Sequence, residues 1–295
     1  MQSADFLSAV FFYLKVGENL NQNWIVENLN NAFSTWNGKL GELWGLVTTG
    51  PQTFKGGAVW SVMQTLHNGM VGIGYALVVL FFAISLCKNT MNFHELKRPE
   101  AAIHYFLRFV AAKALVGYGM DIMLNVFSIC NGIVTDMADS MGGISEAMVS
   151  LPAEMQTAIE SVVFLAGIPL WLVTILGSLF ITVLSFVMIL TVYGRFFRLY
   201  MYTALAPLPL AAFAGESTQS VGISFLKSYV GVCLEGAVIV LACVIYSAFV
   251  STPTVTSGEA TTIVWSYLAE TVFNMLVLVG LIKGSDRIIH EMMGL

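Results

Sequence analysis

Residues 162–193 read VVFLAGIPLWLVTILGSLFITVLSFVMILTVY, a stretch of 32 residues without a charged side chain. The hydrocarbon core of a bilayer, ~30 Å thick, needs about 20 such residues in a helix that rises 1.5 Å per residue. The stretch therefore predicts a membrane-spanning helix. Because 32 residues make a helix of roughly 48 Å, we expect it to tilt or to project beyond the lipid.

The apolar character extends over the whole 295-residue chain, which is 57% hydrophobic with a mean hydropathy of +0.79. Only 11% of the residues are charged, less than half the ~25% of soluble domains. This composition excludes soluble enzymes, disordered regulators and basic nucleic-acid-binding domains. It predicts an all-α polytopic membrane protein with about five transmembrane helices, the other four runs being Leu66–Leu86, Ala114–Val134, Phe225–Val250 and Ile263–Ile282.

The long run is followed by an apolar segment that contains two prolines. Residues 199–214 read LYMYTALAPLPLAAFA, with Pro207 and Pro209 inside. Proline removes an amide donor and clashes with the preceding helical turn, and lipid cannot satisfy the freed carbonyl groups. We therefore expect a broken or re-entrant segment and not a sixth span.

The basic residues predict the orientation, because cytoplasmic loops of membrane proteins are rich in Lys and Arg. Residues 88–113 hold five basic residues, whereas residues 136–160 hold five acidic residues and no basic one. We expect the first segment in the cytoplasm and the second outside, with the N-terminus outside and the C-terminus inside. Residues 1–65 then form an extracytoplasmic segment and residues 66–295 a transmembrane domain.

The N-terminal segment contains apolar residues at helical spacing, from Phe33 and Trp36 to Val47. This pattern predicts an amphipathic helix on the outer membrane surface or on a partner. The six asparagines between Asn19 and Asn31 favour caps and turns over a long helix there.

Motifs of enzyme chemistry are missing from the sequence. It contains no HExxH, Walker A, GxSxG or GxGxxG pattern, so we predict a non-enzyme without cofactor or metal. The four cysteines lie in or beside apolar runs and are interpreted as small buried hydrophobes. The glycines of GMVGIG, Gly69, Gly72 and Gly74, do not follow a strand and are interpreted as helix-packing positions.

Three acidic residues fall within the predicted spans: Asp121, Glu235 and Glu270. An ionised group there costs several kcal/mol unless it is paired or hydrated. Each residue either lines a water-filled path or bonds structurally to a neighbouring helix. Five basic residues next to the spans are candidate contacts of lipid headgroups, a cytoplasmic partner or passing nucleic acid: Lys97, Arg98, Arg108, Arg195 and Arg198.

The sequence from Thr191 to Gly215, TVYGRFFRLYMYTALAPLPLAAFAG, resembles the TrbL-like polytopic subunits of type IV secretion systems. The likeness consists of a long span that ends in arginines, an Ala-Leu-Ala-Pro-Leu stretch and a Phe-Ala-Gly exit. The predicted topology, with its outward segment between the second and third spans, is also similar. Here that segment has only about 27 residues, shorter than in many members of the family.

The resemblance implies a subunit of a conjugative DNA-transfer machine in the cytoplasmic membrane of a bacterium. It implies a ring of identical copies, with five copies favoured. Secretion-system ATPases, pilin-like subunits, membrane lipids and translocating DNA would be its partners. The alternative is a small secondary transporter, or its membrane subunit, that uses the intramembrane carboxylates.

Overall fold

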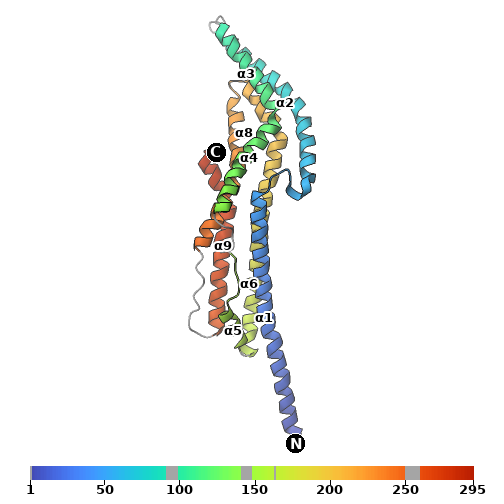
Figure 1. The fold of residues 1–295 in the computed structure, drawn as a ribbon, viewed down its shortest axis with the longest axis vertical. Helices are drawn as coiled ribbons and strands as arrows, with labels where there is room; N and C mark the ends of the chain where they lie inside the picture. Colours follow the sequence, from blue (N-terminus) through green and yellow to red (C-terminus); the bar gives the residue numbers. More distant parts are fainter. Residues whose placement is uncertain (1, 91–98, 141–147, 163, 250–259) are drawn as a thin grey trace. The chain divides into compact units, whose positions relative to one another are not determined.

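The computed structural model describes residues 2–90, 99–140, 148–162, 164–249 and 260–295. Over these ranges the regular structure is entirely helical, as Figure 1 shows. The expected all-α fold is confirmed. The helices are α1 (Gln2–Thr48), η1 (Phe54–Gly57), α2 (Ala58–Thr90), α3 (Pro99–Gly117), α4 (Gly119–Ser140), α5 (Ala153–Glu160), α6 (Phe164–Leu205), α7 (Pro207–Ala211), η3 (Ala212–Ala214), α8 (Gln219–Phe249) and α9 (Ala260–Met293).

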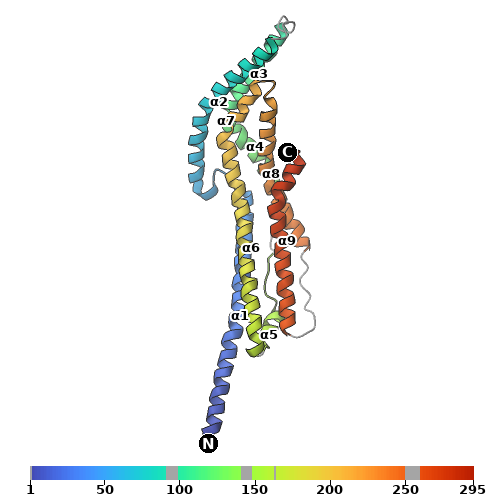
Figure 2. The same cartoon turned by 180° about the vertical axis from the view of Figure 1, so that it is seen from behind.

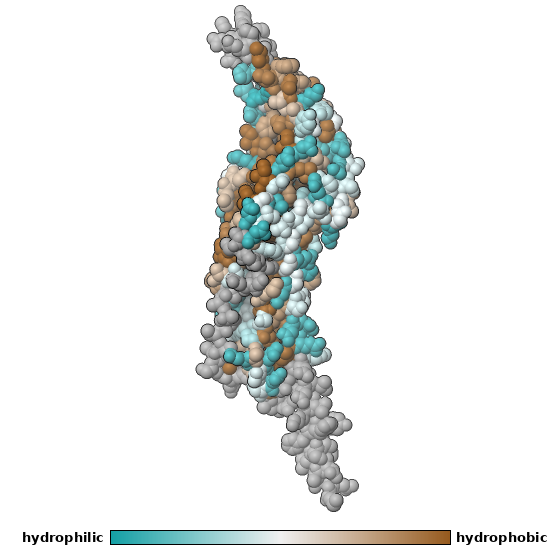
Figure 3. All heavy atoms as spheres, viewed as in Figure 1, coloured by the Kyte–Doolittle hydropathy of each residue, from teal (hydrophilic) through white to brown (hydrophobic). Residues whose placement is uncertain are grey.

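Four stretches of helix are long and apolar enough to cross a membrane: Phe54–Lys88, Pro169–Leu205, Gln219–Phe249 and Thr262–Met293. A fifth span is formed if the bent pair Ile103–Gly117 and Gly119–Asp139 counts as one. The prediction of about five spans is therefore confirmed. The side chains agree with this assignment, because large hydrophobic residues such as Leu190, Phe186 and Ile129 are exposed. Figure 3 shows hydrophobic residues at the surface of the molecule with hydrophilic residues between them.

The run Ala114–Val134 is not the single straight helix that we expected. The chain bends by 72° between α3 and α4, at Tyr118. Glycines flank the bend and let other helices approach: a Cβ on Gly117 would lie 2.8 Å from the Tyr75 hydroxyl, and one on Gly119 would lie 3.2 Å from Leu210. The bend is thus packed against α2 and α7.

Helix α6 is longer than its apolar sequence indicated. It continues past residue 193 to Leu205, so its 42 residues extend over roughly 63 Å. The expected interruption is present, but residues 199–205 still belong to α6. The helix ends at Leu205, two residues before Pro207, which occupies the first position of α7, where a missing amide hydrogen costs nothing.

One compact unit contains residues 1–44, 141–191 and 242–283. In it α1 is one continuous helix, so the prediction of turns around the asparagines is wrong. Its apolar stripe, expected on the membrane or a partner, is buried within the chain: Ile25, Leu29, Phe33, Trp36, Leu40 and Leu43. The side chain of Asn37 fixes the segment before α5, donating to the Val149 carbonyl at 2.8 Å and accepting from the Val149 amide at 2.9 Å.

The second unit contains residues 45–140, 192–241 and 284–295. The short helix α7 packs between α2 and α3, and Figure 2 labels it beside them. Its residues Leu210 and Ala211 are completely buried, with Ala206 just before them. They share one apolar core with residues of α2, α3, α4, α6 and α8, among them Val78, Val116, Phe127, Leu199 and Cys233.

Candidate functional site

The second unit holds a cluster of charges centred on the buried Glu235 of α8. The Glu235 side chain is only 1% exposed. Arg198 of α6 donates from one terminal nitrogen to both Glu235 carboxylate oxygens, at 2.7 Å each. Its other terminal nitrogen lies 2.5 Å from a carboxylate oxygen of Asp286, and the Ser285 hydroxyl donates to Glu235 at 3.3 Å. The cluster therefore joins α6, α8 and α9.

Arg195, one helical turn before Arg198, has a different environment. It is 1% exposed and donates to three backbone carbonyls: Val47 at 3.3 Å, Val232 at 3.2 Å and Cys233 at 3.1 Å. Among the described residues it donates to no carboxylate. The Val47 carbonyl lies in the last turn of α1, where helical carbonyls have no partner within the helix. The Arg195 guanidinium thus caps the end of α1 and fixes it to α8.

Gly236 lets Arg195 lie against the backbone of α8. A Cβ at this position would be 2.7–2.8 Å from the guanidinium atoms of Arg195, so a larger residue would displace the guanidinium from its present position. Because Val232, Cys233, Glu235 and Gly236 belong to one helical turn, a single turn of α8 accepts both arginines. Sequence analysis did not identify Gly236, Ser285 or Asp286. Only Gly236 could have been recognised as a candidate, because it directly follows the intramembrane carboxylate of Glu235.

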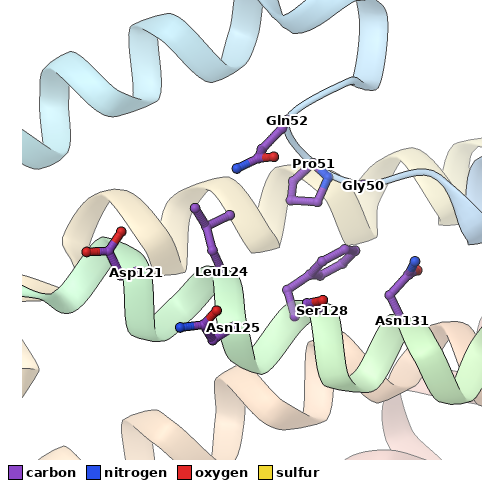
Figure 4. Close-up of a pocket in the computed structure, with 9 residues that line it drawn as sticks. Gly50, Pro51, Gln52, Asp121, Leu124, Asn125, Ser128 and Asn131 are labelled. Carbon is purple, nitrogen blue, oxygen red and sulfur yellow. The ribbon is translucent and has the colours of Figure 1, made fainter.

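A second candidate region is a polar pocket of about 570 Å³ on α4. Asp121, Asn125, Ser128 and Asn131 of α4 line one side, and residues Gly50–Gln52 line the other (Figure 4). The loop that contains Gly50–Gln52 is held in place because the Tyr200 hydroxyl donates to the Pro51 carbonyl at 2.8 Å. Phe54 also stacks on Phe196, with ring centroids 4.1 Å apart.

The three predicted carboxylates therefore have different surroundings. Glu235 is buried and paired, whereas Asp121 and Glu270 are exposed on α4 and α9. Asp121 lines the polar pocket, and Glu235 is not part of that pocket. Sequence analysis missed Asn125, Ser128 and Asn131, although their spacing from Asp121 places all of them on one helical face.

The predicted basic contacts also differ from one another. Arg195 was expected to contact lipid, a partner or nucleic acid, but the structure buries it inside the protein. Arg198 is 29% exposed and paired. Arg108 donates to the side-chain oxygen of Gln219, and Lys97 and Arg98 lie outside the described residues. No group of three His, Cys, Asp or Glu residues that could hold a metal ion occurs in the described part of the chain.

Comparison with known proteins connects this architecture to a family. The family model described as "TrbL/VirB6 plasmid conjugal transfer like protein" matches residues 36–207, more than half of the chain. The match includes the bent pair α3 and α4, both arginines of α6 and the break at Pro207. No curated protein and no solved structure matches the chain. The chain therefore belongs to the TrbL/VirB6 plasmid conjugal transfer-like family and is a membrane protein of that family.

Proposed function

We propose that this protein is a non-enzymatic channel or assembly-platform subunit of a conjugative type IV secretion system. It would help to move DNA, alone or bound to protein, across the cytoplasmic membrane of a bacterium. The observation that carries the proposal is the family match over residues 36–207. Because the sequence contains no nucleotide-binding loop, the energy would come from the ATPases of the system.

The charge cluster around Glu235 supports a platform role. Loss of Arg198 would leave the Glu235 carboxylate buried without its ionic partner, which costs about 3–5 kcal/mol. The Arg198, Glu235 and Asp286 interactions therefore hold α6, α8 and α9 in one arrangement. In this proposal Glu235 has a structural role, whereas Asp121 and Glu270, both exposed, are available to water or to a partner.

Assembly into a ring of identical copies, with five favoured by the family resemblance, belongs to the same proposal. Helix α9 presents Gly280 and Gly284, one turn apart, and no atom lies within 4 Å of a Cβ at either position in the described structure. Small residues at this spacing allow membrane helices to approach closely. Imaging of purified particles in detergent measures the copy number.

Deletion of the gene from the transfer system, followed by a mating assay, tests the proposed function. We expect the transfer frequency to fall to that of a donor without a transfer machine, and the wild-type gene in trans to restore it. An unrelated conjugative plasmid in the same donor is the control and should transfer normally. Unchanged transfer after deletion would exclude the secretion role. A loss of proton-linked solute uptake without a mating defect would establish the transporter alternative.

A further inference from the structure

Helix α4 carries a continuous polar stripe within an apolar membrane segment. Polar side chains recur every three or four residues, which places them on one face of the helix. A neighbouring stripe of Met123, Phe127, Cys130, Val134 and Ala138 is buried and fixes the rotation of the helix about its axis. The polar stripe consists of Asp121, Asn125, Ser128, Asn131, Thr135 and Asp139.

The stripe is accessible and nearly as long as a bilayer is thick. Asp121, Asn125, Ser128 and Asp139 are exposed, and Asn131 and Thr135 are half-buried. From Asp121 to Asp139 the helix rises by about 27 Å, against ~30 Å for the hydrocarbon core. Hydrocarbon cannot satisfy these groups, and each unsatisfied polar group in lipid costs several kcal/mol.

The polar pocket lies along the first half of this stripe, where Gln52 faces α4 (Figure 4). Asn131 donates to the Thr48 carbonyl at 3.3 Å. Its side-chain oxygen is buried without a hydrogen-bond partner in the described part of the protein. Buried polar atoms are normally satisfied by protein or by ordered water. A polar pocket of about 570 Å³ is large enough for several waters, each of which needs ~30 Å³.

The charges of α4 decide which solutes suit this surface. The helix contains three aspartates, Asp121, Asp136 and Asp139, and no Lys or Arg. A surface of one sign attracts counter-ions and repels ions of its own sign. Hydrated cations therefore suit the stripe, whereas a phosphate backbone does not.

We infer that the polar stripe of α4 is the wall of a water-filled path that admits hydrated cations. This inference rests on the assignment of the bent pair α3 and α4 as one membrane span, because it requires α4 to lie within the membrane. It also assigns to α4 a role separate from contact with DNA, since the helix has no Lys or Arg to neutralise a phosphate backbone.

Cysteine accessibility tests the inference in the full-length protein. Of the native cysteines, only Cys87 is exposed; Cys130, Cys233 and Cys243 are buried. A Cys87→Ser parent therefore keeps the core intact and controls for background labelling. Asn125→Cys and Ser128→Cys report on the stripe, and Ile129→Cys and Ile133→Cys report on the exposed apolar flank of the same helix (69% and 45% exposed).

Membranes carrying each variant are treated with a charged methanethiosulfonate, and the remaining thiols are counted by mass-tagging. The cysteine thiolate, which forms in water, attacks the sulfenyl sulfur of such a reagent and displaces methanesulfinate, leaving a mixed disulfide. We expect the stripe positions to react at least about tenfold faster than the flank positions, a factor that corresponds to ~1.4 kcal/mol. The cationic reagent should react faster than the anionic one, and Asp121→Asn should reduce that preference.

Two results would overturn the inference. Equal labelling of stripe and flank would place α4 in bulk water outside the membrane. Labelling of the stripe only after detergent extraction would show that lipid or another protein chain covers it. The labelling rates do not depend on DNA transfer, so the two proposals can fail separately. If the stripe is labelled as expected but deletion of the gene leaves mating unchanged, only the secretion role is rejected. If deletion abolishes mating but the stripe is not labelled, only the water-filled path is rejected.

Discussion

Arg195 and Arg198 show how the position of a residue sets its role within one helix. Both lie on the same face of α6, three residues apart. Arg198 meets carboxylates and keeps part of its side chain exposed, whereas Arg195 is enclosed by backbone carbonyls. Arginine suits both positions because its planar guanidinium group presents five N–H donors. Lysine, a compact charge at the end of a flexible chain, could not hold three carbonyls from two helices in the same way.

Replacement of Glu235 tests the buried ion pair. We expect Glu235→Leu to lower the free energy of unfolding by about 1.5–3 kcal/mol, because Arg198 loses its charge-assisted hydrogen bonds to Glu235 and keeps only Asp286. Glu235→Gln should cost less, since the amide oxygen still accepts from Arg198. The measurement is the thermal unfolding midpoint in detergent.

Glu270 supplies the matched control for this prediction. It is a glutamate in an apolar span, but it is exposed, so Glu270→Leu should change the stability by no more than about 0.5 kcal/mol. Equal losses at the two positions would show that the ion pair contributes nothing particular to the fold.

At the scale of the helices, the sequence was sufficient to predict the spans but not their ends and bends. Apolar length predicted α2, α6, α8 and α9, and two prolines predicted the break after α6. The bend at Tyr118 could not be predicted, because it depends on what packs against Gly117 and Gly119. Neither could the continuity of α1, since burial of one face stabilises a helix despite the weak helix propensity of asparagine.

The candidate site was predictable only in part. Apolar surroundings made Asp121, Glu235 and Glu270 conspicuous. The partners of Glu235 were not predictable, because Arg198 lies 37 residues earlier and Ser285 lies 50 residues later on another helix. Which charges meet depends on the rotation of three helices about their axes. Tertiary packing sets that rotation.

The glycines of GMVGIG provide a test at this scale. In α2 a Cβ on Gly74 would lie 2.9 Å from both the Pro207 carbonyl oxygen and a methyl group of Val116. We expect Gly74→Ala to destabilise the protein by about 1–3 kcal/mol, because the added methyl group overpacks the contact with α7 and α3.

Gly72→Ala is the matched control, two residues away in the same helix. No atom of the described chain lies within 4 Å of a Cβ at Gly72, so alanine should stabilise the helix by roughly 0.5–1 kcal/mol. Opposite shifts of the unfolding midpoint are the expected outcome. A loss of stability in both variants would mean that Gly72 is also a packing position.

For the whole molecule, the orientation in the membrane is the central prediction. Cysteines at Ser34 and Glu154 should react with an impermeant thiol reagent in intact cells, whereas a cysteine at Arg287 should react only in inverted vesicles. All three positions are exposed, and a Cys87→Ser parent removes the exposed native thiol. Labelling of position 287 in intact cells would show that the orientation predicted from the basic residues is wrong.

The contacts between α6 and α8 have a consequence for the biosynthesis of the protein. During synthesis α6 leaves the ribosome before α8, so its two guanidinium groups are made before Glu235 and the Val232 and Cys233 carbonyls. The charge-free part of α6 is long enough to span the bilayer without α8. The end of α6 that carries the two arginines acquires its partners on α8 only after residues 232–235 have been made.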